Sequence, residues 1–157
     1  MSKWLTPGEM RAWRAYIIAS RRLYEALDRD LAAHGLSMAD YEVITHLSDA
    51  PQRRMRMSEL ADSSLLSRSR LSHRMKVLEV AGLVHRESCN DDRRGAFAVL
   101  TEKGWQAIVA AAPDHVSSVR ARFIDLLQSE EHEALAGVFE RVGEKLKENI
   151  DRECSGD

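Results

Sequence analysis

The residues of this chain best suited to chemistry are cations, and they gather on one short helix and one short loop. The segment 67–81 reads SRSRLSHRMKVLEVA, and the loop 89–95 reads CNDDRRG between two short apolar segments. Arginine and lysine pair with phosphate, and a guanidinium can also grip a guanine edge through two hydrogen bonds. A basic helix beside a basic hairpin tip can reach two grooves of one duplex, so the pattern predicts binding to double-stranded DNA. The candidate DNA-binding residues are Ser67, Arg68, Ser69, Arg70, Ser72, His73, Arg74, Lys76, Arg93 and Arg94.

The helix 67–81 has one apolar face and one basic face. At about 100° per residue, Leu71, Met75 and Leu78 point to the same side, which leaves the basic residues to face outward. We expect Arg70 to read a base, and we expect the serines at the helix start, Ser67 among them, to contact phosphate. The alternative is a solvated basic face, which is common on surface helices.

The loop 89–95 packs four opposite charges into a few residues. We expect Asp91 or Asp92 to hold one arginine while Arg93 or Arg94 enters a minor groove. The alternative is that all four side chains pair only with one another.

Helices must position these two elements, and the sequence marks their ends. Thr6 and Glu9 form a capping box, Gly35 can stop the first helix near His34, and Pro113 should kink or break a later one. Ser58 and Ser67 are expected to cap the two helices at the centre of the chain. We expect helices over residues 7–34, 37–47, 59–63, 68–81, 102–127 and from 129 onward, and a hairpin of strands 83–87 and 96–100.

This order of elements, together with two motifs, resembles the MarR family of winged helix-turn-helix regulators. The motifs are LExxGLV at 78–84 and a stretch from Asp92 through Arg94 to LTEKG at 100–104. The resemblance implies a mainly α fold with a small β-hairpin wing, a winged helix-turn-helix flanked by long terminal dimerisation helices. The domains would be 1–36 (N-terminal dimerisation helix), 37–100 (DNA binding) and 101–157 (C-terminal dimerisation helices). It further implies a homodimer that binds a near-palindromic operator, typically as a repressor, and that a small molecule can release.

Two observations on the residues themselves bear on the dimer and on the effector. The first helix is apolar on two sides, as expected if it packs against both its own domain and a second subunit. A small aromatic or anionic effector would find aromatic rings where the family often holds one, although rings at helical spacing are more often plain core. The candidate lining residues are Trp13, Tyr16, Tyr41, His46 and Trp105.

Composition sets limits on the other functions. The net charge of the chain is −2, but residues 53–94 hold ten Lys and Arg against six Asp and Glu, so the basic centre lies on an acidic frame. Two cysteines form no metal motif, no cofactor is expected, and the catalytic and phosphate-binding motifs of enzymes are missing. There is neither a signal peptide nor a membrane-spanning run, so a cytoplasmic protein is expected. The alternatives are a redox sensor at Cys89, a metal site that includes His85, an enzyme, and a winged-helix protein that binds protein.

Overall fold

The chain begins with a long helix, α1 (Pro7–Leu31), whose first turn is closed by a capping box. The Thr6 amide donates to the Glu9 carboxylate at 2.7 Å, and the Glu9 amide donates back to the Thr6 hydroxyl at 3.3 Å. A single 3₁₀ turn, Ala32–His34, follows, and Gly35 then adopts the left-handed conformation with φ of 71°. The predicted capping box and the predicted stop at Gly35 are therefore confirmed. This computed structural model describes residues 4–64, 66–88 and 96–154, with side chains to residue 147.

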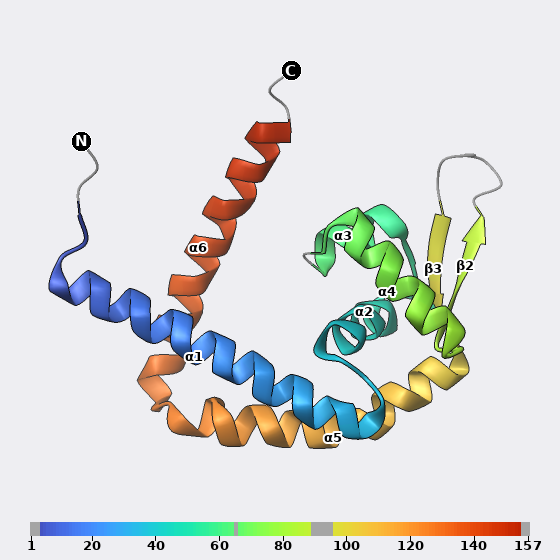
Figure 1. The fold of residues 1–157 in the computed structure, drawn as a ribbon, viewed down its shortest axis with the longest axis horizontal. Helices are drawn as coiled ribbons and strands as arrows, with labels where there is room; N and C mark the ends of the chain where they lie inside the picture. Colours follow the sequence, from blue (N-terminus) through green and yellow to red (C-terminus); the bar gives the residue numbers. More distant parts are fainter. Residues whose placement is uncertain (1–3, 65, 89–95, 155–157) are drawn as a thin grey trace. The chain divides into compact units, whose positions relative to one another are not determined.

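A small sheet and a group of short helices follow α1 (Figure 1). The sheet is antiparallel with the order β1-β3-β2, so the hairpin strand β3 lies in the middle. The fold predicted from the sequence, mainly helical with a β-hairpin wing, is confirmed, and strand β1 is an addition that the sequence analysis did not predict. The elements are α2 (Met38–Asp49), β1 (Arg54–Arg56), α3 (Met57–Ser63), α4 (Arg68–Val80), β2 (Val84–Ser88), β3 (Ala96–Leu100), α5 (Glu102–Arg122) and α6 (Ser129–Cys154).

The expected start of α3 is wrong, and the break that was one of the two outcomes expected at Pro113 does not occur. Helix α3 begins two residues earlier than predicted, and its start is held by the Arg56 amide donating to Glu59 at 3.3 Å rather than by a Ser58 cap. Helix α5 continues through Pro113 to Arg122 instead of breaking, and a separate 3₁₀ turn follows at Ile124–Leu126. Pro113 is exposed, so the carbonyl that loses its helical partner can be hydrated.

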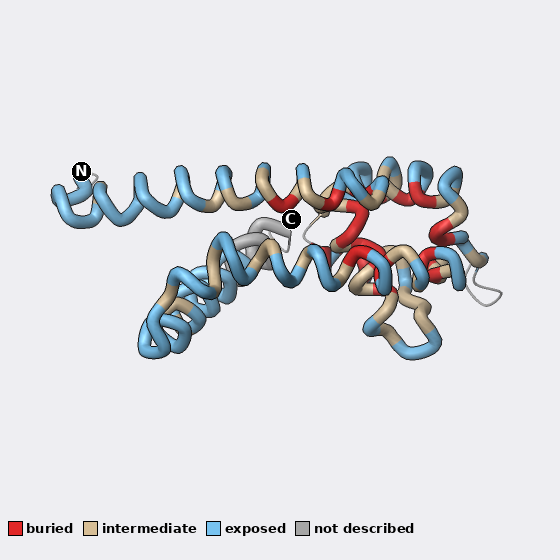
Figure 2. The backbone as a smooth tube through the Cα atoms, turned by 90° about the horizontal axis from the view of Figure 1, so that it is seen from below, coloured by how far each residue is buried: buried red, intermediate tan, exposed pale blue. Residues whose placement is uncertain are grey.

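The core lies where α2, α3, α4, α5 and the sheet meet. Figure 2 shows burial concentrated there, whereas the N-terminal half of α1 is exposed. Helix α1 contributes to this core through its C-terminal end only. The largest fully buried side chains are Leu31, Ile44, Leu47, Leu60, Leu71, Met75, Leu78, Val43, Val84 and Ser64.

Polar contacts join α1 to its neighbours. The Met38 amide at the start of α2 donates to Asp28 at 2.7 Å, and His34 Nε2 lies 2.9 Å from an Asp114 carboxylate oxygen on α5. The Ser118 hydroxyl donates to Asp30. The first contact joins α2 to α1, and the other two join α1 and the turn that follows it to α5.

The chain divides into two compact units, Met1–Val119 and Arg120–Asp157. In the second unit, Arg120 pairs with Asp125 at 2.6 Å, and the Gln128 amide donates to Glu131 at 2.8 Å just before α6. Helix α6 carries an exposed apolar stripe that includes Val138, Val142 and Leu146.

Candidate nucleic-acid interface

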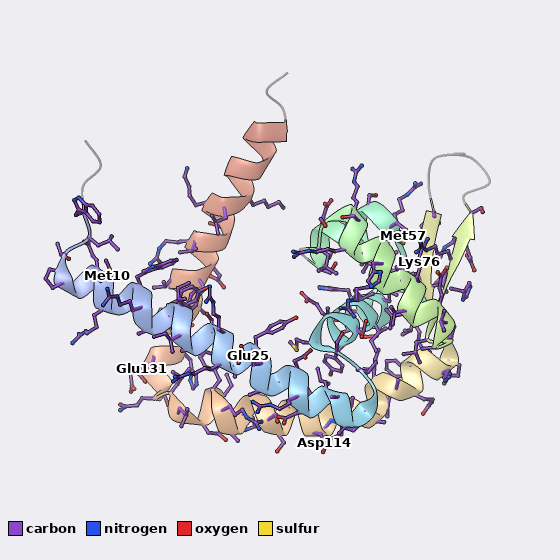
Figure 3. The ribbon with its side chains drawn as sticks, in the orientation of Figure 1. Met10, Glu25, Met57, Lys76, Asp114 and Glu131 are labelled. Atoms are coloured by element: carbon purple, nitrogen blue, oxygen red, sulfur yellow. The ribbon has the colours of Figure 1, made fainter. Side chains whose placement is uncertain are left out.

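Helix α4 presents a polar, mostly basic surface opposite its buried face. Leu71, Met75 and Leu78 are each at most 1% exposed, as predicted, so the other side of the helix faces solvent. The Ser67 hydroxyl accepts the Arg70 amide at 3.3 Å and caps the helix, which confirms the predicted cap. Figure 3 labels Lys76 on this helix. The exposed candidates are Ser67, Arg68, Ser69, Arg70, His73 and Lys76.

Arg74 is partly buried and already has a protein partner. Its Nη1 lies 3.6 Å from Oδ1 of Asp40, whose side chain is only 8% exposed. The other oxygen of Asp40 accepts the Ser37 amide and the Ser37 hydroxyl, at 3.1 and 2.5 Å, so the same carboxylate also closes the first turn of α2. This arrangement uses Arg74 to anchor α4 on α2, a role that the spacing of residues along α4 did not reveal.

The C-terminal end of α4 is held by the start of α5. The Lys103 ammonium donates to the Ala81 carbonyl at 2.6 Å, where a cation is favoured by the helix dipole. The Thr101 hydroxyl lies within hydrogen-bond distance of the carbonyls of Gly82 and Leu83, at 2.8 and 3.0 Å. The residues of the LTEKG motif, 100–104, therefore form a socket that holds the C-terminal end of α4.

Gly104 completes that socket because no side chain fits there. A Cβ at this position would lie 2.2 Å from the Leu83 carbonyl oxygen and 2.6 Å from a Leu100 methyl. The same Leu83 oxygen also accepts the Thr101 amide at 3.0 Å, so it has little freedom to move away. The close approach of the two backbones explains the glycine of the motif.

The hairpin beside α4 leads to the loop 89–95, which the sequence analysis expects to contact the minor groove of DNA. Strands β2 and β3 pair from Val84↔Leu100 to Ser88↔Ala96, and α4 packs beside β2. The tip residues Asp91, Asp92, Arg93 and Arg94, together with Cys89, lie outside the described residues.

Strand β1 adds two arginines that the sequence analysis missed. The guanidinium carbon of Arg54 lies 3.9 Å from the centre of the Phe97 ring, and that of Arg56 lies 5.2 Å from it. Arg54 also lies 3.5 Å from Glu87. The alternation of basic residues and methionines in RRMRM at 53–57 was the available signal, since alternation is typical of a strand. Arg56 is exposed at the start of α3 and is a further candidate for phosphate contact.

The five residues expected to line an effector pocket are divided among separate places. Trp13 and Tyr16 form a tilted pair with ring centres 6.2 Å apart on the exposed part of α1. Tyr41 is a core residue that packs on His115 at 4.6 Å, and Trp105 lies under the guanidinium of Arg53 at 4.3 Å. His46 lies half-buried on α2, near Glu42.

A hollow of about 420 Å³ opens instead between α1, the start of α2 and the first turns of α4. Burial raises the pKa of the Tyr24 hydroxyl in its wall, and the carboxylates of Asp28 and Glu42 raise it further, so this group is a neutral donor at physiological pH. The hollow is lined by Tyr24, Ala39, Leu66, Ser69, Arg70, His73 and Arg74.

The described part of the chain holds neither a metal site nor a membrane-spanning helix. No group of three or more His, Cys, Asp and Glu side chains there could hold a metal ion. Among those same residues, no helix is both long enough and apolar enough to cross a bilayer.

Comparison with known proteins identifies this arrangement. The profile of the MarR family matches residues 34–95, the segment that holds α2, α3, α4 and β2. The structure of AbsC, a MarR family transcriptional regulator from Streptomyces coelicolor, is 46% identical, with a TM-score of 0.89 over 93% of this chain and 99% of AbsC. The chain belongs to the MarR family.

Further relatives agree with the MarR assignment. Sco3205, a MarR family regulator from Streptomyces coelicolor solved in complex with DNA, is 40% identical over 92% of both chains, with a TM-score of 0.90. The transcriptional regulator MhqR of Bacillus subtilis is 28% identical over 83% of this chain and 88% of its own length. This protein is accordingly a DNA-binding transcriptional regulator of the MarR family and not an enzyme, as the sequence predicted.

Proposed function

We propose that this MarR protein is a homodimeric repressor in which α4 enters the major groove of a near-palindromic operator. The observation that carries the proposal is the outward face of α4, where Arg70 and Lys76 are exposed. This helix is anchored on Asp40 at its middle and by Lys103 at its C-terminal end. Arg70 is the proposed base reader, because a guanidinium can bond guanine O6 and N7 together. The contacts proposed around it come from Ser67, Arg68, Ser69, Ser72, His73, Arg74 and Lys76.

Arg74 is proposed to make the weakest DNA contact among these residues. Its pairing with Asp40 leaves its side chain 36% exposed, so it reaches phosphate only while it also holds α4 on α2. Arg56, exposed at the start of α3, is proposed to contact the backbone beside the major groove.

The wing arginines, Arg93 and Arg94, are proposed to enter the adjacent minor groove or to grip its phosphates. The support is the sequence of the tip, in which Asp91 or Asp92 can hold one arginine while the other reaches the DNA. Their replacement by alanine should weaken binding to specific and random DNA alike and lower the dependence on salt.

The test is a binding experiment on a duplex selected from random sequence by the wild-type protein. Arg70→Ala should cost roughly 1–3 kcal/mol of binding free energy on the selected duplex and flatten the preference among base pairs. Arg11→Ala, which removes an exposed arginine from α1, is the matched control and should change neither quantity. An Arg70→Ala protein with wild-type affinity and preference would contradict the assignment of the reader.

The dimer is proposed to form through the terminal segments 1–36 and 101–157, which flank the DNA-binding segment 37–100. The support is exposed apolar surface on those segments: Trp13 is 54% exposed on α1, Val116 55% on α5 and Leu146 58% on α6. Faces of this kind are usually covered in soluble proteins. Sedimentation should give a dimer at micromolar concentration, and truncation after Gln128 should abolish it. A full-length chain that sediments as a monomer would contradict this part of the proposal.

We propose that the dimer acts in the cytoplasm and represses transcription by covering promoter DNA. We further propose that a small aromatic or anionic molecule releases the dimer from the DNA. The support is the hollow beside α4, because an anion bound there by Arg70 and Arg74 would pair with the Arg70 guanidinium, the proposed base reader. Salicylate titrated against the complex of the protein with a labelled duplex should release the DNA and lower the fluorescence anisotropy of the label. Among variants that sedimentation shows to be dimers, release should be weakened in Tyr24→Phe and kept in Trp13→Ala. The opposite pattern would show that the effector binds at the exposed aromatic rings of α1 instead of in the hollow.

A further inference from the structure

The side chain of Arg86 joins the wing sheet to the recognition helix. It extends from the middle of β2, and its Nη2 donates to the carbonyl oxygen of Ser72 at 3.1 Å. Its Nε lies 3.5 Å from Oε1 of Glu79. The side chains of Arg86 and Glu79 are 32% and 31% exposed, so this junction lies at the edge of the core rather than in free solvent.

Strand alternation explains why Arg86 points at α4. Successive side chains of a strand face opposite sides of the sheet, so Arg86 shares the face of Val84, which is 2% exposed in the core. Its partner across the ladder is Ala98, which is fully buried. His85 and Glu87 lie on the other face, where they pair with each other at 3.1 Å. Arg86 therefore extends the buried face of β2 outward along the side of α4.

The two contacts of Arg86 are spaced along the helix. Ser72 and Glu79 are seven residues apart, about two turns of helix and roughly 10 Å along its axis. The Glu79 side chain points back toward the start of the helix, which brings its carboxylate to the same guanidinium. One planar group thus holds the middle and the end of α4 against the same strand, and this resists both sliding and tilting of the helix.

We propose that Arg86 is a positioning residue that sets the recognition helix relative to the wing, so that both elements fit the grooves of one duplex. The inference rests on the proposed function, because it needs α4 in one groove and the loop 89–95 in another. That loop begins three residues after Arg86, so the direction of β2 decides where the loop starts relative to Arg70 on α4. Arg86 makes no base contact; it limits the arrangements that the two contacting elements can adopt.

The test compares Glu79→Gln with Glu87→Gln, two substitutions that remove the same charge. Glu79 holds Arg86, whereas Glu87 lies on the opposite face of β2 and pairs with Arg54 and His85. If only charge mattered, both variants would bind DNA somewhat more tightly, because each removes a repulsive carboxylate. Positioning predicts that only Glu79→Gln lowers the preference for the selected duplex.

For each variant we would measure affinity for a duplex selected by the wild-type protein and for random duplex at the same salt. The ratio of the two affinities should fall about tenfold for Glu79→Gln and for Arg86→Lys, which keeps the charge but not the planar two-contact group. The ratio should be unchanged for Glu87→Gln. On the selected duplex, methylation protection in the major groove should weaken together with hydroxyl-radical protection at the wing contact, because a displaced α4 cannot read bases while the wing is also seated. Circular dichroism verifies that each variant is folded.

Failure of the inference can be distinguished from failure of the proposed function. Equal ratios for the wild type, Glu79→Gln and Arg86→Lys would overturn the positioning role alone. A wild-type protein that enriches no sequence from the random pool would overturn the proposed function and, with it, this inference. A parallel loss of affinity for both duplexes in Arg86→Lys would show a general loss of DNA-binding surface and would also contradict positioning.

Discussion

Replacing Gly104 by alanine would test the socket that ends the recognition helix. The added Cβ would lie 2.2 Å from the Leu83 carbonyl oxygen, whereas real Cβ atoms essentially never come within 3.0 Å of such a neighbour. Helix α5 and the Leu83 backbone must therefore separate by about 0.8 Å. Insertion of a methyl group into a packed site costs about 1–3 kcal/mol, and alanine recovers little at a first-turn helix position. We expect Gly104→Ala to lose about 2–3 kcal/mol of unfolding free energy.

The same separation should reach the DNA-binding surface. Leu83 follows α4 directly, and its carbonyl oxygen accepts bonds from both the amide and the hydroxyl of Thr101. A shift at this point loosens the end of α4, so DNA affinity should fall even at temperatures where the variant is fully folded. Urea unfolding at one fixed protein concentration measures the stability, and fluorescence anisotropy with labelled duplex measures the affinity.

Gly137→Ala is the matched control. Gly137 lies inside α6, where a Cβ would meet only the end of the Arg141 side chain at 3.5 Å, an ordinary contact. Alanine there should raise stability by roughly 0.5–1 kcal/mol through helix propensity and leave DNA affinity unchanged. The argument about the socket would be refuted if Gly104→Ala kept wild-type stability, since the close backbone approach would then be absent in solution.

Three further predictions follow from other contacts. Ser67→Ala should lose about 1 kcal/mol of unfolding free energy, measured in urea, because the Arg70 amide loses its cap; an unchanged midpoint would contradict the cap. Asp40→Ala should lose about 2 kcal/mol or more, because it removes the first-turn cap of α2 and leaves Arg74 without its carboxylate; a loss no larger than that of Ser67→Ala would argue against the anchor. Burial lowers the pKa of His115 below 6.5 in the folded protein, against the opposing charge of Asp30, so the unfolded chain takes up the proton first. The neutral His115 side chain therefore contributes its full stabilisation above about pH 6.5, and this contribution is lost as the pH falls from there through the folded pKa. His115→Phe should flatten this decrease of stability with falling pH in thermal unfolding curves. An unchanged pH profile would exclude His115 as the source of the decrease.

Local signals in the sequence were sufficient to predict the helices, the hairpin and the outward face of α4. A capping box at Thr6, a cap at Ser67 and the spacing of Leu71, Met75 and Leu78 depend on residues three or four apart, and the structure agrees with each. The three-residue strand β1 was missed because its partner Phe97 lies about forty residues away, and so short a run carries little pattern of its own. The helix does not break at Pro113, which local rules could not settle because they do not tell whether the helix has a solvated side.

The sequence by itself determined which residues are helical, which face of the recognition helix is basic, and that the chain resembles the MarR family. Only the tertiary structure decided what the basic residues do. Arg70 and Arg74 are four residues apart and look alike in the sequence, yet Arg70 is exposed whereas Arg74 is anchored on a buried Asp40 of another helix. Arg86, an ordinary strand residue in the sequence, acquires two partners on α4. The physical reason is that helix and strand patterns arise from neighbours along the chain, whereas the partner of a charged side chain is chosen by whichever element the fold brings within reach.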